Sequence, residues 1–135
     1  MSKSIMSKNK FTNQWLRHFA ASVEKDALEN YVRDQYIWHV FSFNLLNETA
    51  FLTGDAARKA YDDADKSNCI FCNQFGSEGV TDRVVADYLS AQSIDANVAE
   101  LYVVAKDFSW TYIKTHENNA CGPYFMKINL HTRER

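Results

Sequence analysis

Residues 101–117 read LYVVAKDFSWTYIKTHE and give the clearest secondary-structure signal in the chain. Two runs of β-branched and aromatic residues, 101–105 and 110–116, flank a short polar turn around Lys106 and Asp107. Such a pattern predicts an antiparallel β-hairpin.

Three further segments have the composition of strands. Residues 36–43 read YIWHVFSF and are apolar on both faces, as a central strand is, and residues 69–75 read CIFCNQF and end at a glycine-containing segment. A last strand is expected after Gly122 and Pro123, with one face made by Tyr124, Met126, Ile128 and Leu130.

Helices are predicted mainly in the N-terminal half. Apolar residues at helical spacing begin at Phe11, with Thr12 as a candidate N-cap, and continue through residues 24–33, where Ser22 is a candidate cap for a separate second helix. We favour two helices here. Thr53, Gly54 and Asp55 mark the start of another helix, and residues 81–99 favour a helix while leaving a strand open.

Helices early and strands late indicate an α+β fold, with N-terminal helices packed on a largely antiparallel β-sheet that ends in a C-terminal hairpin. The chain of 135 residues and 15.6 kDa fits one domain, predicted over residues 11–130. Residues 1–10, rich in Ser, Lys and Asn, predict a disordered tail, and residues 131–135 a short C-terminal tail.

Composition and charge exclude several classes of protein. A hydrophobic content of 46% excludes disorder for most of the chain, and a net charge of −2 provides no field to attract nucleic acid or a membrane surface. Residues 45–109 hold 11 acidic against 5 basic residues, which would suit a basic protein partner. Without a signal peptide or an apolar stretch of membrane-spanning length, and with an odd number of cysteines, we expect a cytoplasmic protein.

The segments WHVFSF, DAARKAYDDA, LYVVAKDFSWTYIKTHE and CGPYF resemble, in that order, an uncharacterised family of small bacterial cytoplasmic proteins, a domain of unknown function. The resemblance covers roughly residues 11–127. It implies a bacterial source and one compact domain, and it implies no reaction and no catalytic residues.

Cysteine and histidine form the one combination able to hold a metal ion. Cys69 and Cys72 are three residues apart, and His116 and Cys121 would complete a four-ligand zinc site. Residues three apart in a strand point to opposite faces, however, so we favour buried core thiols over a zinc site or a redox pair. We therefore expect no cofactor and no metal.

The two histidines in aromatic surroundings are candidate binding residues. His39 lies in the apolar run 36–43, where a histidine bonded within the core is the simpler interpretation. On the hairpin we expect only one face to enter the main core, with Trp110 and Tyr112 buried and His116 at a rim beside Glu117. The candidate binding surface consists of Trp110, Tyr112, His116, Glu117, Tyr124 and His39.

The sequence contains none of the phosphate-loop, dinucleotide-binding, zincin or serine-hydrolase motifs. The favoured function is therefore a protein-binding module, with an immunity-like protein as one form, that binds a basic partner through an acidic or aromatic surface. The alternative is a small enzyme or metal-binding protein that uses His39, His116, Glu117 and the cysteines. The sequence leaves the oligomeric state open.

Overall fold

A computed structural model describes residues 6–32, 36–42, 45–73, 80–82, 84–116 and 122–128. Within these ranges, five strands form one antiparallel sheet with the order β1-β5-β4-β3-β2. The strands are β1 (Leu52–Thr53), β2 (Cys69–Cys72), β3 (Leu101–Ala105), β4 (Trp110–Lys114) and β5 (Tyr124–Lys127). The predicted hairpin is β3 and β4, which are adjacent at the centre of the sheet.

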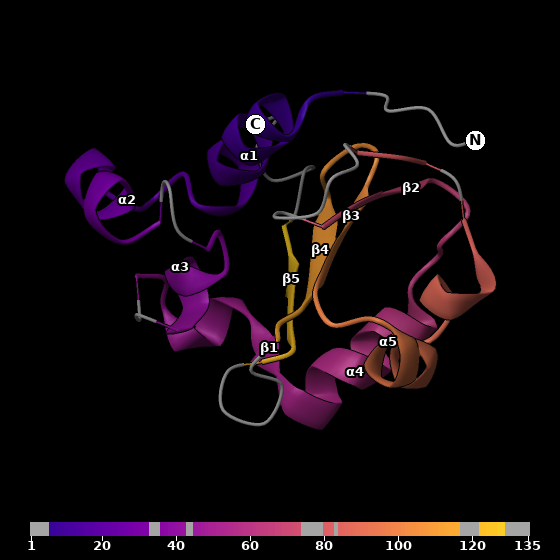
Figure 1. Ribbon diagram of the computed structural model, residues 1–135. Helices are drawn as coiled ribbons and strands as arrows, with labels where there is room; N and C mark the ends of the chain where they lie inside the picture. Colours follow the sequence, from indigo (N-terminus) through magenta and orange to yellow (C-terminus); the bar gives the residue numbers. More distant parts are fainter. Residues whose placement is uncertain are drawn as a thin grey trace.

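Helices cover both faces of the sheet (Figure 1). On one side lie α1 (Lys8–Phe19), α2 (Lys25–Tyr31) and α3 (His39–Ser42), and on the other lie α4 (Gly54–Asp63) and α5 (Ala91–Asn97). Two short 3-10 helices, η1 (Glu48–Ala50) and η2 (Ala86–Tyr88), complete the elements that the described ranges contain. The α+β fold is confirmed.

The side chains of each strand alternate between two hydrophobic cores. On β2, Ile70 and Cys72 face the core under α1 and α3, whereas Cys69 and Phe71 face the core under α4 and α5. Because helices bury both faces, β3 and β4 have no solvent-facing side, and all five residues of each strand are buried.

This arrangement corrects the expectation that only one face of the hairpin enters a core. Trp110 and Tyr112 pack against α4, while Ile113 packs in the opposite core with α1 and α3. Even Lys114 is buried, with its Nζ donating a hydrogen bond to the Val98 carbonyl at 2.8 Å. A charged side chain therefore does not mark the exposed face of this strand.

The prediction of a central strand over residues 36–43 is wrong. Ile37 and Trp38 form a turn, and His39–Ser42 is the short helix α3. The predicted burial is nevertheless correct, since Ile37, Trp38, Val40 and Phe41 are each at most 2% exposed. A short run that is apolar on all sides suits a buried helix as well as a buried strand, and periodicity alone does not separate the two.

The chain is ordered earlier than predicted. α1 begins at Lys8, with Ser7 as N-cap accepting a hydrogen bond from Lys10 N at 3.1 Å, and Met6 pairs with Val80 in an isolated β-bridge. Residues 8–10, which the sequence places in a tail, therefore belong to α1, and Thr12 lies inside the helix instead of capping it. The prediction of two N-terminal helices is confirmed, although α2 begins at Lys25 after Glu24 instead of after Ser22.

The remaining elements follow the sequence closely. α4 starts directly after Thr53, as predicted, and buries Ala57 and Tyr61 against the sheet. Residues 81–99 contain η2 and α5, so the helical alternative is the correct one. Of the face predicted for the last strand, Tyr124, Met126 and Ile128 meet the same core, while Leu130 lies outside the described residues. None of the described helices is long and apolar enough to cross a membrane.

Candidate functional site

Four rings gather where β4 ends beside α3, and a buried carboxylate lies among them. Tyr36 stacks on Trp38 with centroids 5.1 Å apart, and His39 contacts Trp38 edge-on at 4.8 Å. His116 lies 4.9 Å from the Tyr36 ring and 5.8 Å from the Trp38 ring. We call this group the aromatic–histidine cluster: Tyr36, Trp38, His39, Glu100 and His116.

The Glu100 carboxylate holds two members of the cluster. Its Oε2 accepts a hydrogen bond from Trp38 Nε1 at 2.9 Å, and its Oε1 lies 3.0 Å from His116 Nδ1. Because an ionised carboxylate only accepts hydrogen bonds, Nδ1 is the donor and the imidazole orientation is fixed. Glu100 is only 8% exposed, so its charge is compensated by these two donors and not by bulk water.

The pairing of β3 with β4 brings these residues together. Leu101 is opposite Lys114, so Glu100, just before β3, comes next to the end of β4, where Thr115 and His116 follow. From the helical side, the Trp38 backbone N–H donates to the Tyr102 hydroxyl at 3.1 Å, which attaches the turn before α3 to β3. Burial, with a further contribution from the Glu100 charge, raises the pKa of Tyr102 well above its ordinary value, so the hydroxyl stays neutral.

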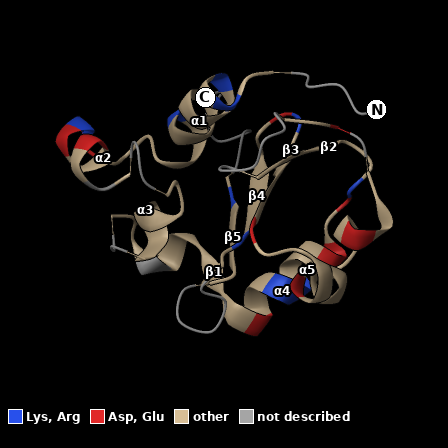
Figure 2. Ribbon diagram, viewed as in Figure 1, with Lys and Arg blue, Asp and Glu red and all other residues tan. Residues whose placement is uncertain are grey.

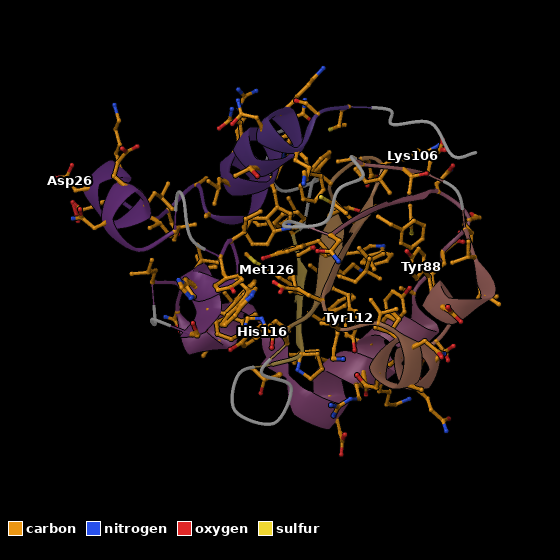
Figure 3. All side chains as sticks on the ribbon, in the orientation of Figure 1. Asp26, Tyr88, Lys106, Tyr112, His116 and Met126 are labelled. Carbon is orange, nitrogen blue, oxygen red and sulfur yellow. The ribbon has the colours of Figure 1, made fainter. Side chains whose placement is uncertain are left out.

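Exposure differs within the aromatic–histidine cluster. Trp38 is 2% exposed and belongs to the core, and Tyr36 and His39 are half-buried. The His116 side chain is 38% exposed, and Figure 3 shows it beside α3. The cluster thus has a rigid buried base, made by Trp38 and Glu100, and a solvent-accessible rim.

The structure unites only part of the predicted binding surface. His39 and His116 both contact the Tyr36 and Trp38 rings. Trp110 and Tyr112 are buried under α4, and Tyr124 is buried with its ring stacked on Phe41 at 4.7 Å. Glu117 lies outside the described residues.

Three members of the cluster were missed by sequence reasoning. The prediction of a strand over residues 36–43 leaves Tyr36 and Trp38 out of the candidate binding surface, whereas the turn and helix that form there bring both rings into contact with His39. Glu100 carried one signal: it is the acid directly before the apolar run 101–105. An acid at the start of a buried strand needs donors from elsewhere in the fold, and sequence position does not identify them.

Cys69 and Cys72 lie on β2, where the sequence favours buried core thiols over a zinc site or a redox pair. Cys69 and Cys72 face opposite cores of the sheet as free thiols, and Cys121 lies outside the described residues. Burial raises the pKa of Cys69 to about 11 and that of Cys72 to about 12. Within the described ranges, no three His, Cys, Asp or Glu side chains gather as metal ligands would.

Figure 2 shows acidic residues on α4, α5 and η2, which correspond to the acid-rich middle of the sequence. Many of these carboxylates have structural roles. Asp55 and Asp95 pair with Arg58, each at 2.8 Å, and Asp63 pairs with Lys59 at 3.2 Å. Several others are also engaged: Asp62 accepts from Ala91 N, Asp65 from Ser67 N and Asp107 from Ser109 N, and Asp82 pairs with Lys106.

The model of one protein family, described as a domain of unknown function (DUF4275), matches residues 4–125. The chain belongs to this family. No curated protein and no solved structure matches the chain. In this DUF4275 protein, two of the segments that carried the resemblance, WHVFSF and LYVVAKDFSWTYIKTHE, meet at the aromatic–histidine cluster through Trp38, His39 and His116.

Proposed function

We propose that this protein is a protein-binding module and that the aromatic–histidine cluster is its binding surface. The proposal rests on one observation, the pairing of a partly exposed His116 with a buried Glu100. The pair lies among the other rings of the aromatic–histidine cluster. Aromatic side chains with one buried and one exposed part are enriched at the centres of protein interfaces.

Preorganisation supports this choice. A side chain that is fixed before binding loses little conformational entropy in the complex, and each rotamer-rich side chain immobilised on binding costs about 0.5–1.5 kcal/mol. The hydrogen bond to Glu100 already orients the imidazole of His116, and the stacked Tyr36 and Trp38 rings hold one another. The cluster therefore offers a partner a rigid surface.

The acidic alternative has less support. The carboxylates on α4 and α5 are largely occupied by Arg58, Lys59 and backbone N–H groups, so less negative charge remains for a partner than the sequence count suggests. A basic protein, such as a toxin that an immunity-like protein neutralises, remains within the proposal, with its contacts made at the aromatic–histidine cluster.

The proposal places the protein in the cytoplasm of a bacterium. Cys69 and Cys72 are buried free thiols, and thiols persist in a reducing compartment. Their raised pKa values keep them protonated near neutral pH, which suits packing and not redox chemistry.

The test compares three forms of the protein as affinity baits in a native cell extract. The first is the wild type, the second carries His39→Ala with His116→Ala, and the third is a control with Asp87→Asn on η2. Binding of any captured protein is then measured with purified components. We expect the double variant to bind at least about tenfold more weakly, which is the loss typical of an interface residue worth 1.4 kcal/mol or more.

The control separates the two surfaces. Asp87 is exposed on the acidic side and is not a member of the aromatic–histidine cluster, so Asp87→Asn should bind like the wild type. If the double variant keeps the wild-type melting temperature and affinity while Asp87→Asn loses affinity, the binding surface is the acidic one and the proposal is wrong.

An enzyme is the second candidate function, favoured by the 3.0 Å contact between Glu100 and His116. A carboxylate that orients an imidazole is a common arrangement for general acid–base catalysis. In that case Glu100 is a positioning residue, and Glu100→Gln should change the pH profile of turnover while the fold stays intact. The buried cysteines are poor nucleophiles, since their raised pKa values disfavour the thiolate. Conversion of a captured partner or small molecule by the wild type, but not by His116→Ala, would favour the enzyme.

A further inference from the structure

The Glu100 carboxylate at the base of the aromatic–histidine cluster is held by two ring N–H groups. One is the neutral indole of Trp38, and the other is the imidazole of His116. The lysines and arginines that form ion pairs in the described part of the chain pair with aspartates, and none of them pairs with Glu100. Hydrogen bonds from neutral rings stabilise a carboxylate and leave its charge in place. With His116 neutral, the cluster therefore carries a negative charge below its solvent-accessible rim.

The lysine nearest to His116 in the sequence lies on the other side of the sheet. Side chains alternate along β4, so Lys114 shares a face with Tyr112, which packs in the core under α4 and α5. The Nζ of Lys114 donates to the carbonyl of Val98, directly after α5. Its positive charge is thus separated from Glu100 by the sheet.

The rim above the carboxylate is made of rings that attract cations. Tyr36 and His39 are half-buried, and the His116 side chain is partly exposed. The centroid of the Tyr36 ring lies 4.9 Å from that of His116 and 5.4 Å from that of His39. The face of an aromatic ring is electron-rich, and a cation within about 6 Å of the ring centroid is attracted to it. Ring faces and the carboxylate below them therefore favour the same kind of group.

We propose that this rim binds an arginine side chain of the protein partner, with the guanidinium against the Tyr36 ring and its charge balanced by Glu100. The proposal rests on the proposed function and names the group that the surface recognises. A guanidinium is planar, weakly hydrated and stacks on aromatic rings, which suits a half-buried site better than a strongly hydrated ammonium. An acidic side chain would be repelled by Glu100. The partner is therefore a basic protein with an exposed arginine near the centre of its interface.

Three small probes test the recognised group on the purified full chain. They are N-acetylarginine amide, N-acetylcitrulline amide, which has nearly the same shape without the charge, and N-acetylglutamate amide, which is anionic. The ring signals of Trp38 and His116 are followed by NMR during titration at about pH 8, above the usual range in which histidine gains a proton. We expect the arginine probe to shift both signals and to bind at least about fivefold more tightly than the citrulline probe. Equal binding of these two probes, or tighter binding of the glutamate probe, would overturn the proposal.

Two charge-removing variants test whether Glu100 is the source of the preference. In Glu100→Gln the arginine and citrulline probes should bind about equally. Asp87→Asn is the matched control, because it removes one negative charge from the exposed η2, and it should keep the preference of the wild type. A folded Glu100→Gln variant that still prefers arginine would refute the role of Glu100. If Glu100→Gln does not fold, the comparison of probes on the wild type decides alone.

The probes and the affinity baits together separate this proposal from the proposed function. If the arginine probe fails on the wild type while His39→Ala with His116→Ala loses the captured partner, the binding surface is correct and arginine is wrong. If the arginine probe binds as expected while the double variant keeps full affinity for the partner, the arginine site stands and the proposed function is wrong.

Discussion

Trp38→Ala is the substitution that tests the buried base of the aromatic–histidine cluster most directly. Trp38 is 2% exposed and contacts the rings of Tyr36, His39 and His116. Its indole Nε1 donates to Glu100 Oε2 at 2.9 Å. Truncation to alanine removes the ring from the core and leaves the buried carboxylate with one donor fewer.

The expected loss of stability follows from both effects. Replacing a buried tryptophan with alanine costs about 3–5 kcal/mol, because apolar contacts are lost and a cavity remains. A hydrogen bond to a charged group contributes about 1.5–3 kcal/mol, and this contribution overlaps with the first because the two are not additive. Trp38→Phe separates them: it keeps most of the ring packing and removes the donor, so it should cost about 1.5–3 kcal/mol.

Urea denaturation followed by circular dichroism measures these changes as shifts in the free energy of unfolding at constant m-value. Leu52→Ala is the control, since Leu52 is 44% exposed and its truncation should change stability by no more than about 0.5 kcal/mol. If Trp38→Ala loses less than about 1 kcal/mol, the indole is not buried against Glu100, and the geometry of the aromatic–histidine cluster is refuted.

Two further predictions concern backbone and pH. Gly122→Ala should destabilise the protein by about 1–3 kcal/mol, because Gly122 has φ +96° and an added Cβ would lie 3.1 Å from the Tyr124 ring. Gly54 is the control, since it has φ +61° but an added Cβ there would meet open space. Gly54→Ala should therefore lower the free energy of unfolding by less in the same urea assay. Burial raises the pKa of Cys69 to about 11 and that of Cys72 to about 12, from ordinary values of 9.0. The stability that depends on the neutral thiols is therefore complete below pH 9.0 and lost as the pH rises through about 11. Unfolding free energies measured from pH 8 to 11 should fall less steeply when both cysteines are replaced by alanine, and equal slopes would contradict the prediction.

The hairpin was predictable because its local signals agree. Leu101–Ala105 and Trp110–Lys114 are continuous β-forming runs with a polar turn between them, and local propensity and tertiary pairing give the same result there. The run around Trp38 was not predictable in the same way. Its residues are apolar on every side, which fixes burial but not the backbone conformation.

The candidate site was predictable only in its histidines. His39 and His116 stand out because ionisable groups in aromatic surroundings need partners, and the prediction that His116 lies at an exposed strand end agrees with its 38% exposed side chain. The candidate binding surface includes Trp110 and Tyr112 because alternation of side chains along the predicted strand 110–116 puts both on the same face as His116. β4 ends at Lys114, however, and His116 contacts rings on the α3 side while Tyr112 packs under α4.

Under the proposed function, Glu100 is the residue that would distinguish a binding surface from ordinary packing at this site. A buried carboxylate is not required for stability, because well-packed apolar residues of similar volume are often equally or more stabilising in its place. At position 100 an apolar side chain would fill the space beside Trp38, yet it would remove the Glu100 oxygen that lies 3.0 Å from His116 Nδ1. What the carboxylate adds is a fixed imidazole at the exposed rim of an otherwise rigid group of rings.

Glu100→Gln tests this point, because it removes the charge at nearly constant volume. We expect the affinity for a captured partner to fall by a larger factor than the loss of folded protein, calculated from the change in stability, accounts for. Equal affinity in Glu100→Gln and wild type would mean that the charge of Glu100 serves the fold and not the surface.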